Sequence, residues 1–163
     1  MMRPVQVIRF AMAMVGAAIA PAAALASGAT NYAARCSMCH QPSGAGLPGQ
    51  FPRLAGRAAQ IASSPDGRAY LAKVLLFGLY GPIRVDDTPI TGLMPPVGTM
   101  TDQDIADLLN HVVALSRVGK PTPTVTIRAY TAAEVAKVRA QGILTSAGVA
   151  TLRAELAARG VIP

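Results

Sequence analysis

The stretch RCSMCHQ, residues 35–41, contains both cysteines of the chain and one of its two histidines. Cys36 and Cys39 are separated by two residues, and His40 follows directly. This C-x-x-C-H pattern is typical of covalent attachment of a c-type haem. Two thiols three positions apart on a helical turn can add to the two vinyl groups of one porphyrin, and the adjacent imidazole then faces the iron. The motif therefore predicts one covalent haem c.

Other uses of these residues fit the sequence less well. A disulfide between Cys36 and Cys39 would close a very short loop and stabilise little. A thiol oxidoreductase needs a low-pKa cysteine in a βαβ context, whereas a Gly- and Pro-rich segment follows here. A zinc site needs four ligands, and the distant His111 would have to join Cys36, Cys39 and His40. A blue-copper site has suitable residue types available, but such sites lie in β-sandwiches.

The first 26 residues have the features of a secretory signal peptide. Arg3 and Arg9 precede the apolar run FAMAMVGAAIA, and Ala24 and Ala26 have the spacing of a cleavage site. A membrane anchor is the alternative, but the run is short and Pro21 interrupts it. We therefore expect export to the periplasm, cleavage after Ala26, and no membrane span in the mature protein.

Charge and composition narrow the choice of partners. Only Arg3 and Arg9 of the fifteen basic residues precede the expected cleavage site, and all eight acids follow it, so the mature chain is near +5. No basic run with interleaved aromatics suggests nucleic acid, so an acidic protein partner is favoured. Aromatic residues make up 4% and Trp is absent. The core must be aliphatic or completed by a group that is not an amino acid.

Apolar periodicity and turn-forming residues predict a mostly helical chain. We expect a short helix over residues 27–40, capped by Ser27 or Thr30, and then an ordered loop over 41–68. A second helix is expected from Asp66, and its apolar face consists of Leu71, Val74, Leu75 and Leu79.

A small hairpin and a third helix are expected next. Ile83 and Val85 alternate with polar residues, and Asp86-Asp87 can form the turn, after which Gly and Pro predict loop. The sequence TDQD from Thr101 predicts a capping box at the start of the third helix. The apolar stripe of that helix consists of Ile105, Leu108, Leu109, Val112 and Leu115.

Two similar stretches lie near the end of the chain. After the linker KPTPTVTI, TAAEVAKVRA at 131–140 matches TSAGVATLRA at 145–154, and each begins with a capping Thr. Helices this short are marginal alone, and their apolar stripes are narrow, so we expect them to pack weakly and to be dispensable for haem binding. The expected division is a signal peptide at 1–26, a haem domain at 27–118 and a two-helix tail at 119–163.

A second axial ligand has to come from a residue outside the attachment motif. Met/His ligation suits electron transfer, and an open face suits gas binding or peroxide chemistry. Met38 lies inside the motif and cannot reach the other face of the ring, whereas Met94 lies in TGLMPPVG. Met100 directly precedes the third helix and is expected to pack onto it. Met94 is therefore preferred to Met100, and His111 is expected at the rim or surface.

The order of the segments YAARCSMCH, FPRLAG, LLFGLYGPI and GLMPPVGTMTDQDIADLLNHV resembles that in class I c-type cytochromes. It is most similar to small monohaem domains that serve periplasmic dehydrogenases, and the resemblance covers about residues 30–117. It implies an all-α fold, with crossing first and last core helices, around one covalently attached haem. The tail is a C-terminal two-helix extension of that fold.

The resemblance also implies roles for individual residues. Cys36 and Cys39 would form the thioethers, His40 would be the proximal ligand and Met94 the distal ligand. The carbonyl of Pro52 would accept a hydrogen bond from the proximal imidazole, which strengthens that ligand. The implied ring contact is Leu54, and Arg53 and Arg57 are either partners of the haem propionates or solvated side chains.

These features predict a periplasmic electron carrier that cycles between Fe(III) and Fe(II) and is not an enzyme. Its partners would be a donor dehydrogenase or an acceptor oxidase with an acidic docking surface. One alternative is a haem-bearing subunit of a periplasmic dehydrogenase, which the tail favours slightly. Another is a haem enzyme or gas sensor with an open axial site, against which GLMPP argues.

Overall fold

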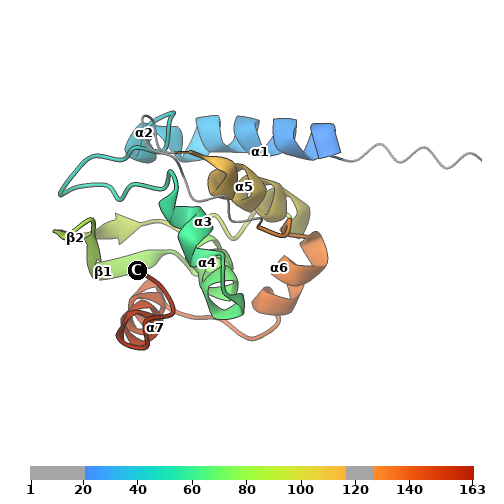
Figure 1. Ribbon diagram of the computed structural model, residues 1–163. Coiled ribbons are helices and arrows are strands. Elements are labelled where there is room, and N and C mark those ends of the chain that lie inside the picture. Colours follow the sequence, from blue (N-terminus) through green and yellow to red (C-terminus); the bar gives the residue numbers. More distant parts are fainter. Residues whose placement is uncertain (1–20, 117–126) are drawn as a thin grey trace, which may run out of the picture.

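The computed structural model describes residues 21–116 and 127–163, and the side chains from residue 27 onward (Figure 1). The helices are α1 (Pro21–Arg35), α2 (Ser37–His40), α3 (Arg57–Ile61), α4 (Pro65–Phe77), α5 (Asp102–Ala114), α6 (Ala132–Arg139) and α7 (Ser146–Ala158). The strands are β1 (Leu79–Val85) and β2 (Thr88–Met94). Most of the expected signal peptide and of the linker lies outside the described residues. Within them, no helix is both long and apolar enough to cross a membrane.

Helix α1 lies across α5, as expected for the first and last core helices (Figure 1). Gly28 permits this crossing, because a Cβ at that position would overlap the main-chain oxygen of Asp107. Tyr32 of α1 joins the fully buried Ile105 and Leu108 of α5 in the main apolar core. The crossing fixes where α1 ends, and therefore where the cysteine motif begins.

The first helix begins earlier than predicted. It includes Pro21 and continues through Ser27 and Thr30, so neither of these residues is its N-cap. The reason is composition: PAAALASGATNYAAR is rich in Ala, the strongest helix former, and Pro is tolerated in a first helical turn. The helix is interrupted at Cys36 and resumes as α2.

The segment 41–68 is not entirely loop. It contains α3, and α4 begins at Pro65, one residue before the predicted start. Ser64 caps α4, since its hydroxyl oxygen accepts a hydrogen bond from the amide of Gly67 at 3.0 Å. Helix α4 ends at Phe77, and its C-cap Gly78 has a φ of 77°, so Leu79, which was expected on the helix face, begins β1 instead.

The predicted hairpin is confirmed, with longer strands. Val85 pairs with Thr88, so the loop contains only Asp86 and Asp87, and both have positive φ (51° and 62°) as in a type I′ turn. Strand β2 continues to Met94, where loop was expected. The fold thus includes a two-stranded sheet. The all-α prediction is wrong for this hairpin and correct for the other described elements, which are helices.

Thr101 is the N-cap of α5, as predicted, but the carboxylate of Asp104 bonds the hydroxyl of Thr101 instead of its amide, so the capping box is only half formed. The hydroxyl oxygen of Thr101 accepts from the amide of Asp104 at 3.1 Å and lies 2.6 Å from its carboxylate. Helices α6 and α7 are also confirmed, with Thr131 and Thr145 as caps.

The prediction that α6 and α7 pack weakly is wrong. Val135 and Val149 have no exposed surface, and Leu156 is almost fully buried. Val135 lies in the main core with α5, and Val149 packs in a second cluster with residues of α4 and β1. Each narrow stripe therefore meets apolar surface on the body of the protein. The boundary between residues 118 and 119 falls in the undescribed linker and stays a prediction.

We predict that Leu156→Ala lowers the free energy of unfolding by about 2–5 kcal/mol, because it leaves a cavity between α7 and the body. The matched control is Ile143→Ala, in the α6–α7 connection, whose side chain is 92% exposed and should cost no more than about 0.5 kcal/mol. Chemical denaturation of the two variants measures the difference. Equal stabilities would contradict the observed docking of α7.

Candidate functional site

Two adjoining cavities lie beneath the cysteine motif, between α2, α4 and the hairpin. The space inside them amounts to about 90 and 200 Å³. Residues that line both cavities include Cys36, His40, Pro52, Leu75, Leu79 and Met94. Leu54 lines the first cavity only. The sequence-predicted site residues, far apart in the chain, therefore meet around one largely apolar space.

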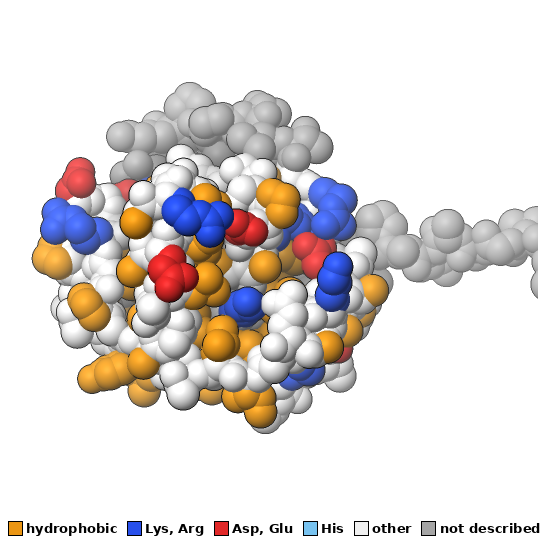
Figure 2. All heavy atoms as spheres, turned by 90° about the horizontal axis from the view of Figure 1, so that it is seen from below, with side chains coloured by type: hydrophobic (Ala, Val, Ile, Leu, Met, Phe, Trp, Pro, Cys, Tyr) orange, Lys and Arg blue, Asp and Glu red, His pale blue; other side chains and the backbone are white. Residues whose placement is uncertain are grey.

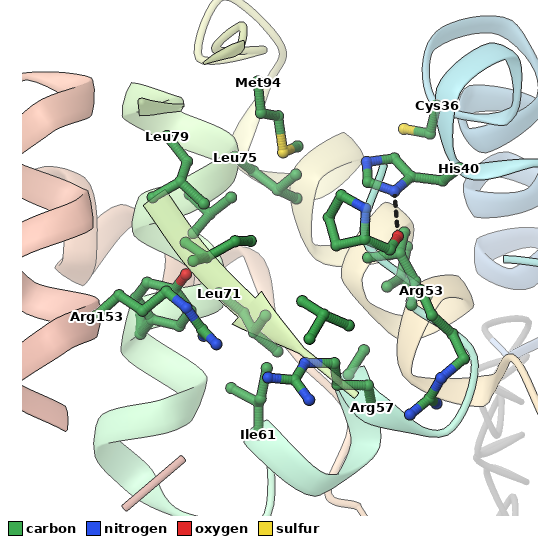
Figure 3. Close-up of a pocket in the computed structure, with 18 of the residues that line it drawn as sticks. Cys36, His40, Arg53, Arg57, Ile61, Leu71, Leu75, Leu79, Met94 and Arg153 are labelled. Atoms are coloured by element: carbon green, nitrogen blue, oxygen red, sulfur yellow. Dashed lines mark hydrogen bonds between the residues drawn. The ribbon is translucent and has the colours of Figure 1, made fainter. Parts of the chain in front are cut away.

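His40 ends α2 and is buried. Its Nδ1 lies 2.9 Å from the carbonyl oxygen of Pro52, so the predicted hydrogen bond is present (Figure 3). A carbonyl can only accept, so Nδ1 carries the proton and Nε2 keeps its lone pair facing the cavity. Burial lowers the pKa of His40, against the opposing effect of the Pro52 bond. A neutral imidazole held in one tautomer is suited to binding a metal.

Met94 lies at the end of β2, and its side chain points into the cavity from the side opposite His40 (Figure 3). Gly78 lets the backbone of this segment approach, because a Cβ there would lie only 2.7 Å from the main-chain oxygen of Met94. Met100 lines neither cavity and packs against the main core. Met38 is 87% exposed. Among the described methionines, Met94 is the one opposite the imidazole.

The two cysteines are free thiols on the same side of the cavities as His40. Cys36 is buried and lines both cavities, and Cys39 lines the second. Burial raises the pKa of Cys36, partly offset by the charge of Arg35. One helical turn thus presents both thiols and the imidazole, as the motif predicts.

The described part of the chain contains no group of three or more His, Cys, Asp or Glu side chains arranged to hold a metal ion. His111, which the zinc and copper alternatives would require, stacks against Tyr32 with ring centroids 5.0 Å apart. It lines neither cavity, in agreement with its expected place away from the site. The positions of these residues therefore support neither a zinc site nor a copper site.

Arginine side chains line part of the first cavity. Arg53 lines the first cavity and makes two 2.7 Å bonds to the carboxylate of Asp86, so its guanidinium already has a carboxylate partner, and its role toward a propionate stays a prediction. Arg57 is buried and lines the first cavity, as the prediction requires. Arg153 of α7 also lines this cavity, although its sequence context did not predict a site residue. One signal was available: Arg153 lies on the buried stripe of α7, four residues after Val149 and three before Leu156.

Comparison with known proteins agrees with this geometry. A family model described as Cytochrome c matches residues 25–116. The chain belongs to the cytochrome c family. It is 42% identical over 120 residues to cytochrome c-552 of Thermus thermophilus (strain ATCC 27634), which covers 74% of this chain and 79% of the relative. It is 41% identical over 116 residues to another cytochrome c-552 from Thermus thermophilus, which covers 71% of this chain and 86% of the relative.

Membership of the cytochrome c family implies a covalently bound haem c and an electron-transfer role with protein redox partners. The residues present fit that group. The cavities of this cytochrome are largely apolar, free thiols lie at their edge, and the unprotonated nitrogen of His40 faces the space toward Met94.

We predict that the haem stays with the polypeptide when the protein is denatured in acid and extracted with an organic solvent, because two thioethers hold it. In the control, Cys36→Ser/Cys39→Ser, any haem taken up should pass into the solvent. Absorbance of the two phases is the measurement. Colour that leaves the unmodified protein with the solvent would show that the attachment is not covalent.

Proposed function

We propose that this cytochrome c is a periplasmic electron carrier whose single haem has His40 and Met94 as axial ligands. The observation that carries the proposal is the placement of the Met94 side chain across the cavity from the free nitrogen of His40 (Figure 3). Ligation by one His and one Met raises the reduction potential and suits electron transfer. The bound haem supplies the Fe(III)/Fe(II) couple, and the chain itself performs no bond chemistry.

The protein residues then have positioning and insulating roles. The Pro52 carbonyl holds the proton of Nδ1 and so fixes the tautomer and orientation of His40. Leu75 and Leu79 are buried, and with Leu54 they line the cavity with apolar surface that excludes water. Ligands held on separate rigid elements, α2 and the end of β2, need to move little when the charge on the site changes.

Two alternatives receive less support. A haem enzyme or gas sensor needs an open axial position, and the inward-pointing Met94 argues against one. The dehydrogenase-subunit alternative relied on a tail available to a partner. Helices α6 and α7 instead bury their apolar stripes against their own protein body. A diffusing carrier is therefore preferred.

Export fits both the chemistry and the fold. Cleavage after Ala26 would remove the start of α1 and would leave Gly28 at its crossing with α5 intact. The haem motif follows that crossing, so the mature chain would keep every residue proposed for the site. The N-terminal sequence of the exported protein tests the cleavage position, and a start other than Ser27 would contradict it.

We predict that Met94→Ala makes the ferric iron high-spin, or leads it to bind another ligand, and lowers the reduction potential, because a sulfur ligand that favours Fe(II) is lost. Met100→Leu is the control, since Met100 packs in the core away from the cavities, and it should leave the spectrum unchanged. Visible absorbance and redox titration measure both. The opposite behaviour of the two variants would show that the assignment of the ligand is wrong.

We predict that electron transfer to a protein partner slows by roughly tenfold or more from low to physiological ionic strength. The mature chain is near +5, and salt screens its attraction to an acidic surface. Stopped-flow kinetics with the partner measures the rate, and reduction by an uncharged small molecule is the control. A bimolecular rate that does not change with salt would count against an acidic docking surface.

A further inference from the structure

Two buried guanidinium groups lie at one end of the first cavity. Arg57 comes from α3 and Arg153 from α7, and each side chain is only 7% exposed. In Figure 3 both guanidinium groups point inward from the side of the cavity away from Cys36. A view from the side of α7 shows a hollow with apolar side chains around it and basic side-chain atoms within it (Figure 2). An apolar cavity thus has a cationic end.

Positive charge exceeds negative charge at this end of the cavity. Among the described residues, the ion pairs include neither Arg57 nor Arg153. The nearby Asp86 is bonded twice to Arg53. Burial, and then repulsion by Arg153, lower the pKa of Arg57. Asp86 opposes this lowering only in part. Buried cations whose charge is only partly offset are costly, so this end of the cavity is suited to an anion.

The contacts that these two arginines make leave donors available. Main-chain oxygens of Arg84 and Pro163 each accept from the Nη2 atoms of both Arg57 and Arg153, at 2.7–3.2 Å. The hydroxyl of Tyr70, from α4, also interacts with Arg153. A guanidinium has five N–H donors in a planar fork that matches a carboxylate. The contacts therefore hold both side chains in place without using all of their donors.

The chemistry of the haem indicates which anion belongs here. Its vinyl edge must lie at Cys36 and Cys39, and its two carboxylates are on the opposite edge of the ring. We propose that Arg57 and Arg153 together bind a haem propionate, so that the C-terminal helix α7 is part of the haem site. This inference rests on the haem, not on the choice of Met94 as ligand. Under this proposal the tail is not dispensable for the haem site, because the charge of Arg153 lies close to the haem iron.

The proposal has a consequence for the reduction potential. A propionate held by two cations stays ionised in both oxidation states, so the potential changes little with pH near neutrality. Loss of the Arg153 charge favours Fe(III) and raises the pKa of the propionate. Reduction is then accompanied by proton uptake, and the potential falls as the pH rises. Tyr70 and Arg53, which line the same cavity, and Asp86, which pairs with Arg53, are unchanged by this substitution.

The test is a redox titration of the haem-loaded protein at several pH values, with absorbance to verify that axial ligation is unchanged. Arg153→Leu should lower the potential above neutral pH by an amount equivalent to about tenfold in the redox equilibrium, or 59 mV, and should make it pH-dependent. In Arg153→Lys, which keeps the positive charge, the potential should return most of the way to that of the unmodified protein. The matched control is Arg159→Leu, which removes the same charge from an exposed position of α7, where Arg159 pairs with Asp66. Arg159→Leu should have the same potential, and the same dependence of the potential on pH, as the unmodified protein.

If Arg153→Leu does not yield folded protein, Arg153→Gln removes the charge and keeps donors for Arg84 and Pro163, and the same shift is expected. Equal potentials and parallel pH profiles for the Arg153 and Arg159 variants would overturn the proposal. A changed axial-ligand spectrum in a Met94 variant would bear only on the proposed ligand, so the two failures can be told apart.

Discussion

Two adjoining, largely apolar cavities lie in the interior of this cytochrome, and the elements described above are arranged around them. A chain with 4% aromatic residues and no Trp has few large side chains for such a space. The haem c of the family supplies the missing apolar surface. Because a bound group stabilises the state that binds it, we expect folding and haem attachment to be strongly coupled. Two elements place the proposed ligands on opposite sides of the cavities: α2 holds His40, and the end of β2 holds Met94.

The position of each wall depends on backbone contacts remote from the iron. Gly28 lets α1 lie against the main chain of α5 and so fixes the start of the cysteine motif. The bond from His40 to Pro52 joins that motif to the loop before α3. Helix α7 completes the enclosure from the other end of the chain, with Val149 and Leu156 packed inward and Arg153 at the cavity. A segment outside the family match thus contributes to the same site.

Much of this could be predicted because the signals were local. The helix caps at Thr101, Thr131 and Thr145 follow from a few consecutive residues, and so does the two-residue turn at Asp86-Asp87. Helix α3 was missed because five residues between Gly- and Pro-rich segments show no periodicity. The contacts of α6 and α7 and the place of Arg153 depend on long-range packing, which a local pattern does not contain. An arginine on an apolar stripe was the one available sign of a buried charge.

The central claim is that Met94 lies over one face of the haem, opposite His40. Its most direct test is proton NMR of the reduced protein with isotope-labelled methionine methyl groups. A methyl group above the face of a porphyrin is shifted strongly upfield by the ring current. The account predicts one such signal, which Met94→Leu removes and Met100→Leu leaves in place. A spectrum without a strongly shifted methionine methyl, or a shifted signal that persists in Met94→Leu, would contradict it.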